Sequence, residues 1–491
     1  MARVQLAKNL ASALKGADQL LVVLSESLLR AGKLKALPDG LGKVAEALGQ
    51  QLEAGPVGGS AWTLTQQSKP AVLGLVLLPD EAARHNHPAR PEVVTRLAAQ
   101  HPGSPKKLAI AVFCRQNEHQ LALLNGVSRA FPQLDLRSGA EVPSVALCTL
   151  DRGGRPLAID PFAQRCFEAS RLAAELVDTP PSELHPGEFS GRAKARLKKL
   201  KGVKLSEIVG DKLSAQGLGG IYGVGKAASQ PPRLLIATHS PAKASRHVAL
   251  VGKGITFDTG GLHLKGRGSM EGMKCDMGGA AAMLGAFEIL AGSSVPTKVS
   301  LLLAMAENAI GPGAFKPDDV LTLHSGKTVE INNTDAEGRL LLGDGVSWAA
   351  RKLGADTVLD AATLTGAQMV ATGALHGAVV CNDAELEDRF VAAARLSGDL
   401  THPLPFAPEL YQPEFQSAVA DMKNSVKNRM NAQASCAAQF VYAHLEGTDV
   451  KWGHIDLAGP AWRNERGTGY GASLIATLVR DLSAPKRRRR R

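Results

Sequence analysis

The most informative segment of the chain reads HVALVGKGITFDTGGLHLKGRGSMEGMKCDMGGAAAMLGAFEIL, residues 247–290. It opens with an apolar run of strand length at 247–252, continues through a glycine-rich excursion, and closes on a helix-like pattern from Gly278 to Leu290. In α/β sheets, ligands bind at turns of this kind, because the backbone can approach closely and helix N-termini point outward. The segment therefore predicts a strand, a ligand-binding turn and a helix within an α/β domain.

Apolar runs of strand length alternate with helix-like stretches along the rest of the chain. The apolar runs lie at residues 107–113, 144–150, 233–239, 299–306 and 356–363. The helix-like stretches lie at residues 163–176, 340–352 and 385–396. This alternation predicts an α/β fold in which most strands are parallel.

The length of 491 residues exceeds one ordinary globular core, so two or three domains are expected. Glycine, proline and charged residues cluster at 151–162 (DRGGRPLAIDPF), between two periodic segments. We therefore predict a smaller N-terminal α/β domain over residues 1–155 and a larger catalytic α/β domain over residues 156–485, followed by a basic tail at 486–491. The catalytic domain is expected to have a central mixed, mostly parallel sheet. Because the first domain shows no concentration of chemically active residues, function is expected in the second.

Composition excludes several classes of protein. Hydrophobic residues make up 44% of the chain and charged residues 21%, which excludes a mainly disordered protein. The longest apolar runs, such as 71–78 and 299–306, are under half the length of a membrane crossing. The six cysteines are spread singly and form no metal-type doublet, which is typical of a reducing compartment. We expect a soluble cytoplasmic protein without membrane association.

The charge of the chain is concentrated at its C-terminus. The formal net charge is +11, and the last six residues, Lys486–Arg491, supply more than half of it, which leaves +5 for the body. A surplus of this size indicates no dedicated polyanionic partner for the body. The tail is expected to be solvated, and it could contact nucleic acid, a membrane surface or a transport receptor, or be a frayed terminus without a role.

Several familiar catalytic motifs are absent or incomplete. Gly220 to Lys226 has the GxxxxGK spacing of a phosphate-binding loop, but Ala227 stands where the magnesium-binding Ser or Thr is required. These glycines are therefore expected to be structural. The sequence has no HExxH helix, no CxxC pair and no GxSxG nucleophile elbow, so acyl-enzyme chemistry has no visible starting point.

Two clusters of charged residues stand out in the second domain. The segment NTDAEGRL lies between a short strand-like run and a helical pattern. If it is extended, its period of two places Asp335, Glu337 and Arg339 on one face. The other cluster lies on the glycine-rich excursion and consists of Lys253, Asp258, Lys265 and Asp276. Taken alone, such charges form either a catalytic cavity or a solvated loop face.

The order and spacing of these residues resemble the leucyl aminopeptidase family. NTDAEGRL is a signature of that family, and the spacing K-x4-D-x6-K-x10-D that begins at Lys253 matches its other site segment without a gap. The resemblance covers roughly residues 165–475 and continues through LVDTPPSEL (176–184), GGIYGVGKAA (219–228), DAATLTGA (360–367), SAVADMKNS (417–425) and HIDLAG (454–459). GGIYGVGKAA together with GKTVEINNTDAEGRL is most similar to the branch described as probable aminopeptidase-like.

The resemblance implies two divalent metal ions a few ångströms apart. One ion would be held by Lys253, Asp258, Asp276 and Glu337, and the other by Asp258, Asp335 and Glu337. Charge supports the pair independently, because without cations the carboxylates would repel one another in a water-poor cleft. The oxygen-rich ligand set suits Zn²⁺ or Mn²⁺. Lys253 can coordinate only as a neutral amine, so its role stays open between metal ligand and counter-ion.

The resemblance also implies a course for the reaction. A water activated by the two ions would attack the scissile carbonyl, and Lys265 would stabilise the oxyanion. Arg339 would hold a bicarbonate that serves as general base. One ion would bind the free α-amino group of the substrate, which confines cleavage to the N-terminal residue.

Further family positions imply a pocket for the first side chain of the substrate. Met273, Thr363 and Gly366 match positions that line this pocket, and Leu364 would offer its backbone carbonyl to the substrate. An apolar wall favours Leu or Met, although only by a few kcal/mol at most, so the preference should be broad. His263 departs from the small polar residue that the family has at this position before Lys265.

We interpret the chain as a metal-dependent aminopeptidase that acts on peptides, and the resemblance implies a homohexamer. The alternative is a DNA-binding accessory protein on the same fold, because some relatives with this fold wrap DNA and the chain is basic. The +5 charge of the body argues against nucleic acid as the main partner. A non-catalytic scaffold is a third interpretation, and it fits poorly because all the family site residues are intact.

Overall fold

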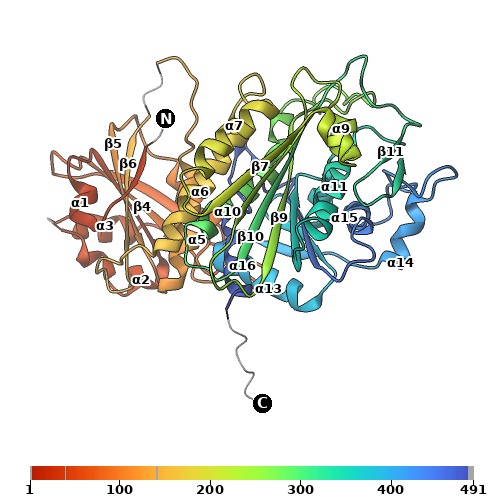
Figure 1. Ribbon diagram of the computed structural model, residues 1–491. Helices are drawn as coiled ribbons and strands as arrows, with labels where there is room; N and C mark the ends of the chain where they lie inside the picture. The colour runs from red at the N-terminus through yellow and green to blue at the C-terminus, as the bar shows by residue number, and fades with distance from the viewer. Residues whose placement is uncertain (1–2, 39, 140–141, 485–491) are drawn as a thin grey trace. The chain divides into compact units, whose positions relative to one another are not determined.

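A computed structural model describes residues 3–38, 40–139 and 142–484, which form two compact α/β units (Figure 1). The chain passes from the first unit to the second within helix α6 (Pro161–Asp178), and Arg395–Leu400 belong to the first unit. The predicted α/β class, with a smaller unit before a larger one, is confirmed. The predicted limits at 155 and 485 stay predictions, and the basic tail lies outside the described residues.

The first unit contains a six-stranded sheet in the order β1-β6-β5-β2-β4-β3, in which only the pair β3 and β4 is antiparallel. Its strands are β1 (Val4–Leu6), β2 (Gln19–Ser25), β3 (Gly59–Leu64), β4 (Val72–Leu78), β5 (Lys107–Phe113) and β6 (Ser144–Leu150). Its helices are α1 (Leu10–Leu14), α2 (Glu26–Arg30), α3 (Leu41–Gly49), α4 (Pro91–Ala98) and α5 (Gln120–Ala130), with 3-10 turns η1 (Lys33–Ala36) and η2 (Asn117–His119). Strand β2 is buried over its whole length, as expected for a continuous apolar run in a parallel sheet.

The second unit is built on an eight-stranded sheet in the order β15-β14-β17-β13-β9-β10-β8-β7. Its strands are β7 (Val203–Val209), β8 (Arg233–His239), β9 (His247–Asp258), β10 (Lys298–Asn308), β13 (Thr357–Ala362), β14 (Gly377–Cys381), β15 (Thr401–Pro403) and β17 (Lys451–Asp456). The central strands β17, β13, β9 and β10 are parallel, whereas β14 pairs with β17, β8 with β10 and β7 with β8 in antiparallel fashion. The predicted mixed, mostly parallel sheet is therefore confirmed.

Short strands and helices surround this sheet. The short strands are β11 (Val320–Thr322), β12 (Thr328–Glu330), β16 (Met422–Lys423), β18 (Trp462–Arg463) and β19 (Arg466–Gly467). The helices are α7 (Pro186–Leu197), α8 (Asp211–Ala215), α9 (Gly219–Gly225), α10 (Gly278–Ala291), α11 (Gly338–Arg351), α12 (Gly366–Thr372), α13 (Ala384–Ser397), α14 (Pro408–Tyr411), α15 (Gln433–Ala443) and α16 (Ala472–Leu482), with 3-10 turns η3 (Met273–Met277) and η4 (Gln412–Phe415).

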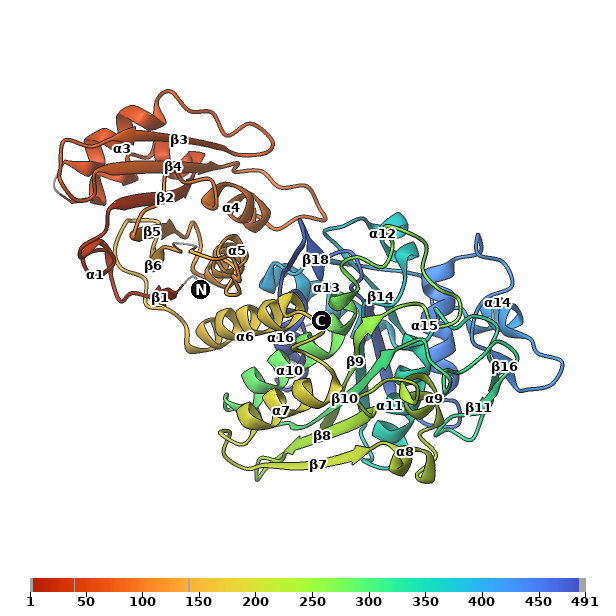
Figure 2. The ribbon, with the colours of Figure 1, turned by 90° about the horizontal axis from the view of Figure 1, so that it is seen from above.

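The large sheet is covered by helices on both faces (Figure 2). Helix α10 packs on β9 and β10 together with α16, while α11 packs on the same strands from the other face together with α15. Helix α10 is buried almost all round, which is typical of an apolar helix enclosed between a sheet and a second helix. Among the described residues, we find no helix with the length and apolar character that a membrane crossing would need.

Strand β9 is longer than the sequence predicted. The predicted strand ended at Gly252, because the glycines that follow indicated a turn. In the structure the strand continues through Lys253 to Asp258. Gly252 is needed for packing, since a Cβ at this position would lie 2.5 Å from the Cα of Ala280 in helix α10. The glycine therefore marks a close approach of helix to strand, and the turn begins only after Asp258.

The glycines with phosphate-loop spacing are structural, as predicted. They form helix α9, which packs against α11 and β11. A Cβ at Gly219 would lie 2.1 Å from the Thr322 carbonyl oxygen, and a Cβ at Gly220 would lie 2.3 Å from the Leu340 carbonyl oxygen. Both glycines thus allow backbone to pack directly against backbone, Gly219 against the end of β11 and Gly220 against the first turn of α11.

The second unit buries a histidine at the end of helix α15. The His444 ring packs against Phe440 with ring centroids 5.0 Å apart, and its Nδ1 lies 2.7 Å from the Ser325 hydroxyl oxygen. Burial, with smaller contributions from Lys327 and Arg351, lowers the pKa of His444 from 6.5 to about 3. The ring is therefore neutral in the folded protein at neutral pH.

We predict that His444 contributes to the acid sensitivity of the fold. Its pKa returns to 6.5 on unfolding, so the unfolded chain takes up a proton below that pH, and stability is lost as the pH falls from 6.5 towards 3. Between pH 7 and pH 5 this loss should amount to about 2 kcal/mol. Denaturant unfolding of metal-free His444→Leu at the two pH values should show a smaller loss than the wild type, and an equal loss would contradict the prediction.

Candidate functional site

The charged residues singled out in the sequence lie at one edge of the large sheet. Strands β9, β10, β13 and β17 run parallel to one another, so their carboxyl ends meet at the same edge. Their last residues are Asp258, Asn308, Ala362 and Asp456. The segments that follow β9 and β13 and the turn before α11 bring further side chains to this edge, which is where open α/β sheets bind ligands.

Lys253 lies within strand β9 and forms the inner part of the site. Its side chain is 3% exposed, and its Nζ lies 2.8 Å from Asp276 Oδ1 and 2.9 Å from Glu337 Oε1. The amine also donates to the Thr363 carbonyl at 3.0 Å. Residue 338 must be glycine for this arrangement, because a Cβ there would lie 2.6 Å from Lys253 Nζ. Lys253 therefore joins η3, the start of α11 and the end of β13.

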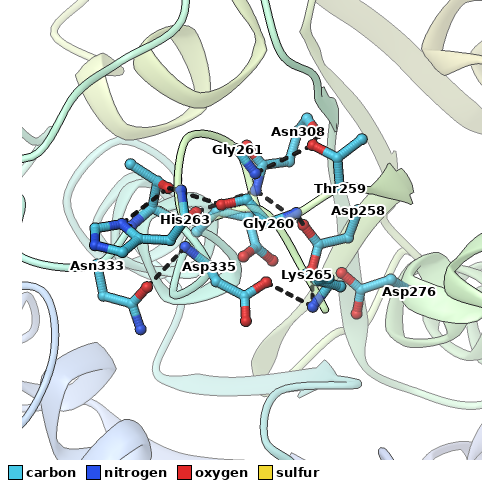
Figure 3. A network of polar contacts seen from close by, with 12 residues as sticks. Asp258, Thr259, Gly260, Gly261, His263, Lys265, Asp276, Asn308, Asn333 and Asp335 are labelled. Atoms are coloured by element: carbon cyan, nitrogen blue, oxygen red, sulfur yellow. Dashed lines mark hydrogen bonds and ion pairs between the residues drawn. The ribbon is translucent and has the colours of Figure 1, made fainter. Parts of the chain in front are cut away.

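Lys265 forms the outer part of the site, on the loop that follows β9. Its Nζ lies 2.8 Å from Asp258 Oδ2 and 2.6 Å from Asp335 Oδ1 (Figure 3). The Asp258 side chain is 4% exposed and the Asp335 side chain 35%. The site is thus closed at the sheet and open to solvent at Asp335.

The carboxylates form an oxygen-rich cluster that fits a metal centre. Asp258, Asp335 and Glu337 each place one carboxylate oxygen within 4.8 Å of the others. Asp276 adds a further carboxylate, and its buried Oδ2 has no hydrogen-bond partner among the residues that the structure describes. Oxygen-rich sets of this kind suit divalent cations that prefer hard ligands. The donor set therefore fits the metals that the family resemblance implies.

Burial raises the pKa values of these carboxylates, whereas the two lysines lower them. Burial, followed by the charge of Glu337, raises the pKa of Asp258 to about 6. Burial also raises the pKa of Asp276 well above its ordinary value, against the effect of Lys253. Burial acts on Glu337 too, but Lys253 outweighs it and leaves the pKa of Glu337 below its usual value. For Lys253 and Lys265, the neighbouring carboxylates outweigh burial and raise both pKa values. The lysines therefore stay charged when they are the only cations in the site.

Two residues that the sequence analysis missed hold the backbone of the site. Asn308 donates its side-chain amide to Asp258 Oδ1 at 2.8 Å and to the Thr334 carbonyl at 3.1 Å. The Thr334 hydroxyl donates to the Gly260 carbonyl at 2.7 Å, and Gly260 has a φ of +86°, which favours glycine. Asn308 and Thr334 are uncharged, so they were not part of the charged clusters that the sequence analysis considered. Several of their partners are backbone groups that only the fold brings near, and the sequence gives no signal for such contacts.

The segment NTDAEGRL is not extended. It forms a turn in which the Asp335 N–H donates to Asn333 Oδ1 at 3.0 Å, and helix α11 then begins at Gly338. Glu337 is the N-cap residue of α11, and Arg339 lies in its first turn. The prediction that Asp335, Glu337 and Arg339 share one face of an extended segment is therefore wrong. Asp335 and Glu337 still converge, because the turn redirects the backbone between them.

Arg339 is buried beside the site and makes no ion pair among the described residues. Its Nη1 donates to the Asn424 carbonyl at 2.9 Å, and its Cζ lies 5.9 Å from the centroid of the Phe440 ring. Its buried Nε has no hydrogen-bond partner in the described part of the chain. Burial lowers the pKa of Arg339 to about 10, so the guanidinium is charged at neutral pH. A charged group with an unused donor fits the binding of a small anion.

The residues predicted to line the substrate pocket lie at the same sheet edge. Thr363 and Leu364 follow the end of β13, and the Thr363 hydroxyl donates to Asp276 Oδ1 at 2.7 Å. Gly366 begins α12, and a Cβ added to it would meet no atom within 4 Å. Met273 begins η3 and is partly exposed. Of these four residues, Thr363 therefore contacts the carboxylate cluster directly, whereas Gly366 is exposed to solvent at the start of α12.

Comparisons with known proteins extend over most of the chain. The model for the cytosol aminopeptidase family, catalytic domain, matches residues 171–479, and that for M17 aminopeptidase N-terminal domain 2 matches residues 57–137. The Mus musculus protein named probable aminopeptidase NPEPL1 is 46% identical over 413 residues, which are 82% of this chain and 78% of that protein. The structure of leucyl aminopeptidase from Trypanosoma cruzi has 37% identity and a TM-score of 0.89, and the match covers 98% of this chain and 97% of that one. The bottromycin maturation enzyme BotP, solved in complex with Mn, has 28% identity and a TM-score of 0.78 over 95% of this chain and 100% of that one.

We predict that Gly338→Ala weakens metal binding. The added Cβ would lie 2.5 Å from Cε and 2.6 Å from Nζ of Lys253, so the lysine must leave its place among the carboxylates. Displacing a group that orients metal ligands typically costs about 10- to 100-fold in affinity. Calorimetric titration of the metal-free protein with Mn²⁺ should show this loss. Gly266→Ala is the matched control, because a Cβ at Gly266 meets no atom within 4 Å; equal affinities in the two variants would contradict the prediction.

Proposed function

Because the chain belongs to the cytosol aminopeptidase family, a family of hydrolases, we propose that it removes the N-terminal residue from peptides by means of two divalent metal ions. Leu or a similar apolar residue would be preferred at the N-terminus of the substrate. The observation that carries the proposal is the convergence of Asp258, Asp335 and Glu337 within 4.8 Å, beside Asp276 and Lys253.

The inner and outer parts of the site would each hold one ion. Lys253, Asp258, Asp276 and Glu337 would hold the first ion, and Asp258, Asp335 and Glu337 the second. When bound, such ions polarise a carbonyl oxygen and acidify a water molecule. Zn²⁺ and Mn²⁺ both suit the donor set, and the Mn complex of BotP supports Mn²⁺. Lys253 would lose its proton to become a ligand, since only the neutral amine has a free lone pair.

Lys265 would stabilise the oxyanion that forms when the substrate carbonyl is attacked. Its Nζ lies between Asp258 and Asp335, at the boundary between the buried floor of the site and solvent. The neighbouring carboxylates outweigh burial and raise its pKa above the ordinary value, and the proposed role requires Lys265 to be a cation when the carbonyl is attacked. A fixed charge directed at a developing oxyanion is worth far more in a water-poor site than in water.

Arg339 would hold bicarbonate, which would supply the general base. The guanidinium is charged and buried, and its Nε has no hydrogen-bond partner among the described residues. Guanidinium groups match planar oxyanions through paired donors. The base would lie close to the metal ligands, because Arg339 follows Glu337 by two residues in the first turn of α11.

The substrate side chain would lie against Met273, Thr363 and Gly366, and Leu364 would accept a hydrogen bond from the substrate through its carbonyl. The hydrogen bond from the Thr363 hydroxyl to Asp276, a proposed metal ligand, supports this placement. Because an apolar pocket discriminates by only about 1–3 kcal/mol per methylene, the enzyme should accept several apolar residues.

We also propose that the enzyme acts in the cytoplasm as a homohexamer, without a membrane partner. The family name, cytosol aminopeptidase, supports the location. Nucleic acid is at most a secondary partner. The DNA-binding alternative is not favoured, because the catalytic-domain family model and the relatives reported above, such as the Mus musculus and Trypanosoma cruzi proteins, carry aminopeptidase names.

The first activity prediction concerns metal dependence. The purified protein supplied with Mn²⁺ or Zn²⁺ should release p-nitroaniline from Leu-p-nitroanilide, and it should lose this activity in a chelator because the ions activate the nucleophile. Adding back each metal separately should restore the rate and rank the metals. A folded, metal-loaded preparation that cleaves no aminoacyl amide would refute the proposed function.

The second activity prediction concerns Asp335→Asn and Lys265→Ala. Asn cannot supply the charge of the carboxylate that would bind the second ion, and Ala removes the cation that would stabilise the oxyanion, so each should lower kcat by about 100-fold or more without unfolding the protein. Asp449→Asn and Lys201→Ala are matched controls at exposed positions outside the site. If either site variant turns over substrate at a near-normal rate, the role assigned to that residue is wrong.

A further inference from the structure

We propose that His263 is a positioning residue that holds the loop bearing Lys265 against the segment bearing Asp335. The inference rests on the proposed function, because it assigns His263 a part in keeping Lys265 and a metal ligand in register. His263 lies two residues before Lys265, and Figure 3 shows both on the loop that faces Asp335. The hydrogen-bond partner of His263, Thr334, directly precedes Asp335 in the sequence. The contact therefore joins the two segments next to the groups that the chemistry needs.

Thr334 is the point at which the two segments meet. Its hydroxyl accepts from the His263 backbone N–H at 2.8 Å and donates to the Gly260 carbonyl at 2.7 Å. Its own backbone N–H donates to His263 Nδ1 at 3.1 Å. Its carbonyl accepts from the Asn308 amide at 3.1 Å. Every polar group of Thr334 is thus occupied, and the imidazole ring supplies one of the partners.

The hydrogen bonds assign the proton on the imidazole ring. The Thr334 hydroxyl has one proton and gives it to Gly260, so although His263 Nδ1 lies 3.2 Å from this oxygen it receives no proton from it. Nδ1 accepts from the Thr334 N–H and is therefore the unprotonated nitrogen, which leaves the proton of the neutral ring on Nε2. Nε2 has no hydrogen-bond partner among the described residues, so the contact to the site is made by Nδ1 alone.

Loss of the ring would leave a buried donor without a protein acceptor. Thr334 is completely buried, and no other acceptor for its N–H occurs in the described part of the chain. Because His263 is itself exposed, solvent would then be the only replacement for Nδ1, and a mobile water does not hold the Thr334 backbone at a fixed point as the ring does. A shift of the backbone at Thr334 would move Asp335, the next residue.

We call the hydrogen bond between the Thr334 N–H and His263 Nδ1 the clamp. It matters most when cations occupy the site. Lys265 itself fastens its loop by pairing with Asp258 and Asp335. Cations bound to these carboxylates would repel the lysine and remove both ion pairs. The loop would then be held by its backbone contacts and by His263, so the position of Lys265 relative to the substrate would depend on the ring.

Three substitutions at His263 separate the two ring nitrogens. In His263→Asn, the side-chain oxygen stands where Nδ1 stood and can accept from the Thr334 N–H. In His263→Gln, the oxygen stands where Nε2 stood, and in His263→Ala no acceptor remains. The experiment measures kcat and KM on Leu-p-nitroanilide with Mn²⁺, and the affinity of each metal-free protein for Mn²⁺ by calorimetry.

We expect His263→Ala and His263→Gln to lose about 10- to 100-fold in kcat and about 10-fold in Mn²⁺ affinity, as is typical when a group that orients a metal ligand is removed. KM should change by less than about threefold, because the substrate pocket lies elsewhere, and His263→Asn should retain both properties within about threefold. Ser269→Ala, at an exposed position of the same loop, serves as the control and should match the wild type.

Three outcomes would overturn the inference. Full activity and Mn²⁺ affinity in His263→Ala would show that the clamp is dispensable. Rescue by Gln and not by Asn would assign the function to Nε2, and equal losses in Asn, Gln and Ala would show that the hydrogen bond through Nδ1 is not what matters. If His263→Ala does not fold, the comparison of Asn with Gln still decides. An inactive wild type would refute the proposed function, while the Mn²⁺ titrations would still test the clamp.

Discussion

The balance of charge at the carboxyl edge of the large sheet governs the geometry of the whole site. Four carboxylates and two lysines lie there, and Lys253, Asp276 and Glu337 are almost completely buried. Removing such groups from water costs several kcal/mol each unless opposite charges and hydrogen bonds compensate. The structure supplies this compensation by backbone placement, since β9, η3 and α11 each contribute one of the three side chains. Glycine at 338 is part of the same arrangement, because it leaves room for the Lys253 side chain.

The site has a rigid inner part and a more adaptable outer part. The inner groups stand on a central strand, at a helix cap and on a 3-10 turn, where packing leaves little freedom. The outer groups, Lys265 and Asp335, stand on a loop and a turn, and Asp335 is 35% exposed. Their register depends on hydrogen bonds through Thr334, Asn308 and His263. Lys265 and Asp335 are charged groups, but the hydrogen bonds that fix their positions are made by neutral polar groups.

Much of this arrangement can be predicted from the sequence. The alternation of apolar runs predicts the α/β fold, and parallel strands must bring their carboxyl ends together, which explains why Lys253 and Thr363 meet although they are far apart in the chain. The limits of β9 could not be predicted, because Gly252 can indicate either a turn or a close helix contact and only the position of α10 decides. The helix predicted over 340–352 begins two residues earlier, at Gly338, and the turn before it could not be predicted because a two-residue period in NTDAEGRL fits a strand until the hydrogen bond from Asp335 to Asn333 is known. Asn308 escaped notice because its partners lie on other segments.

The raised pKa values of the metal-free site link metal binding to proton release. Lys253 is held as a cation by Asp276, Glu337 and Asp258, although burial opposes its charge, and burial raises the pKa of Asp258 and Asp276. A metal ion needs the neutral amine and the ionised carboxylates, so each binding event must displace protons from the groups that bind it. In the function proposed above, the lysine that neutralises the carboxylates would therefore compete with the metal until it loses its proton. A buried lysine would compensate the carboxylates as a cation and would become available as a ligand once neutral, a combination that a permanently charged arginine at the same position could not provide.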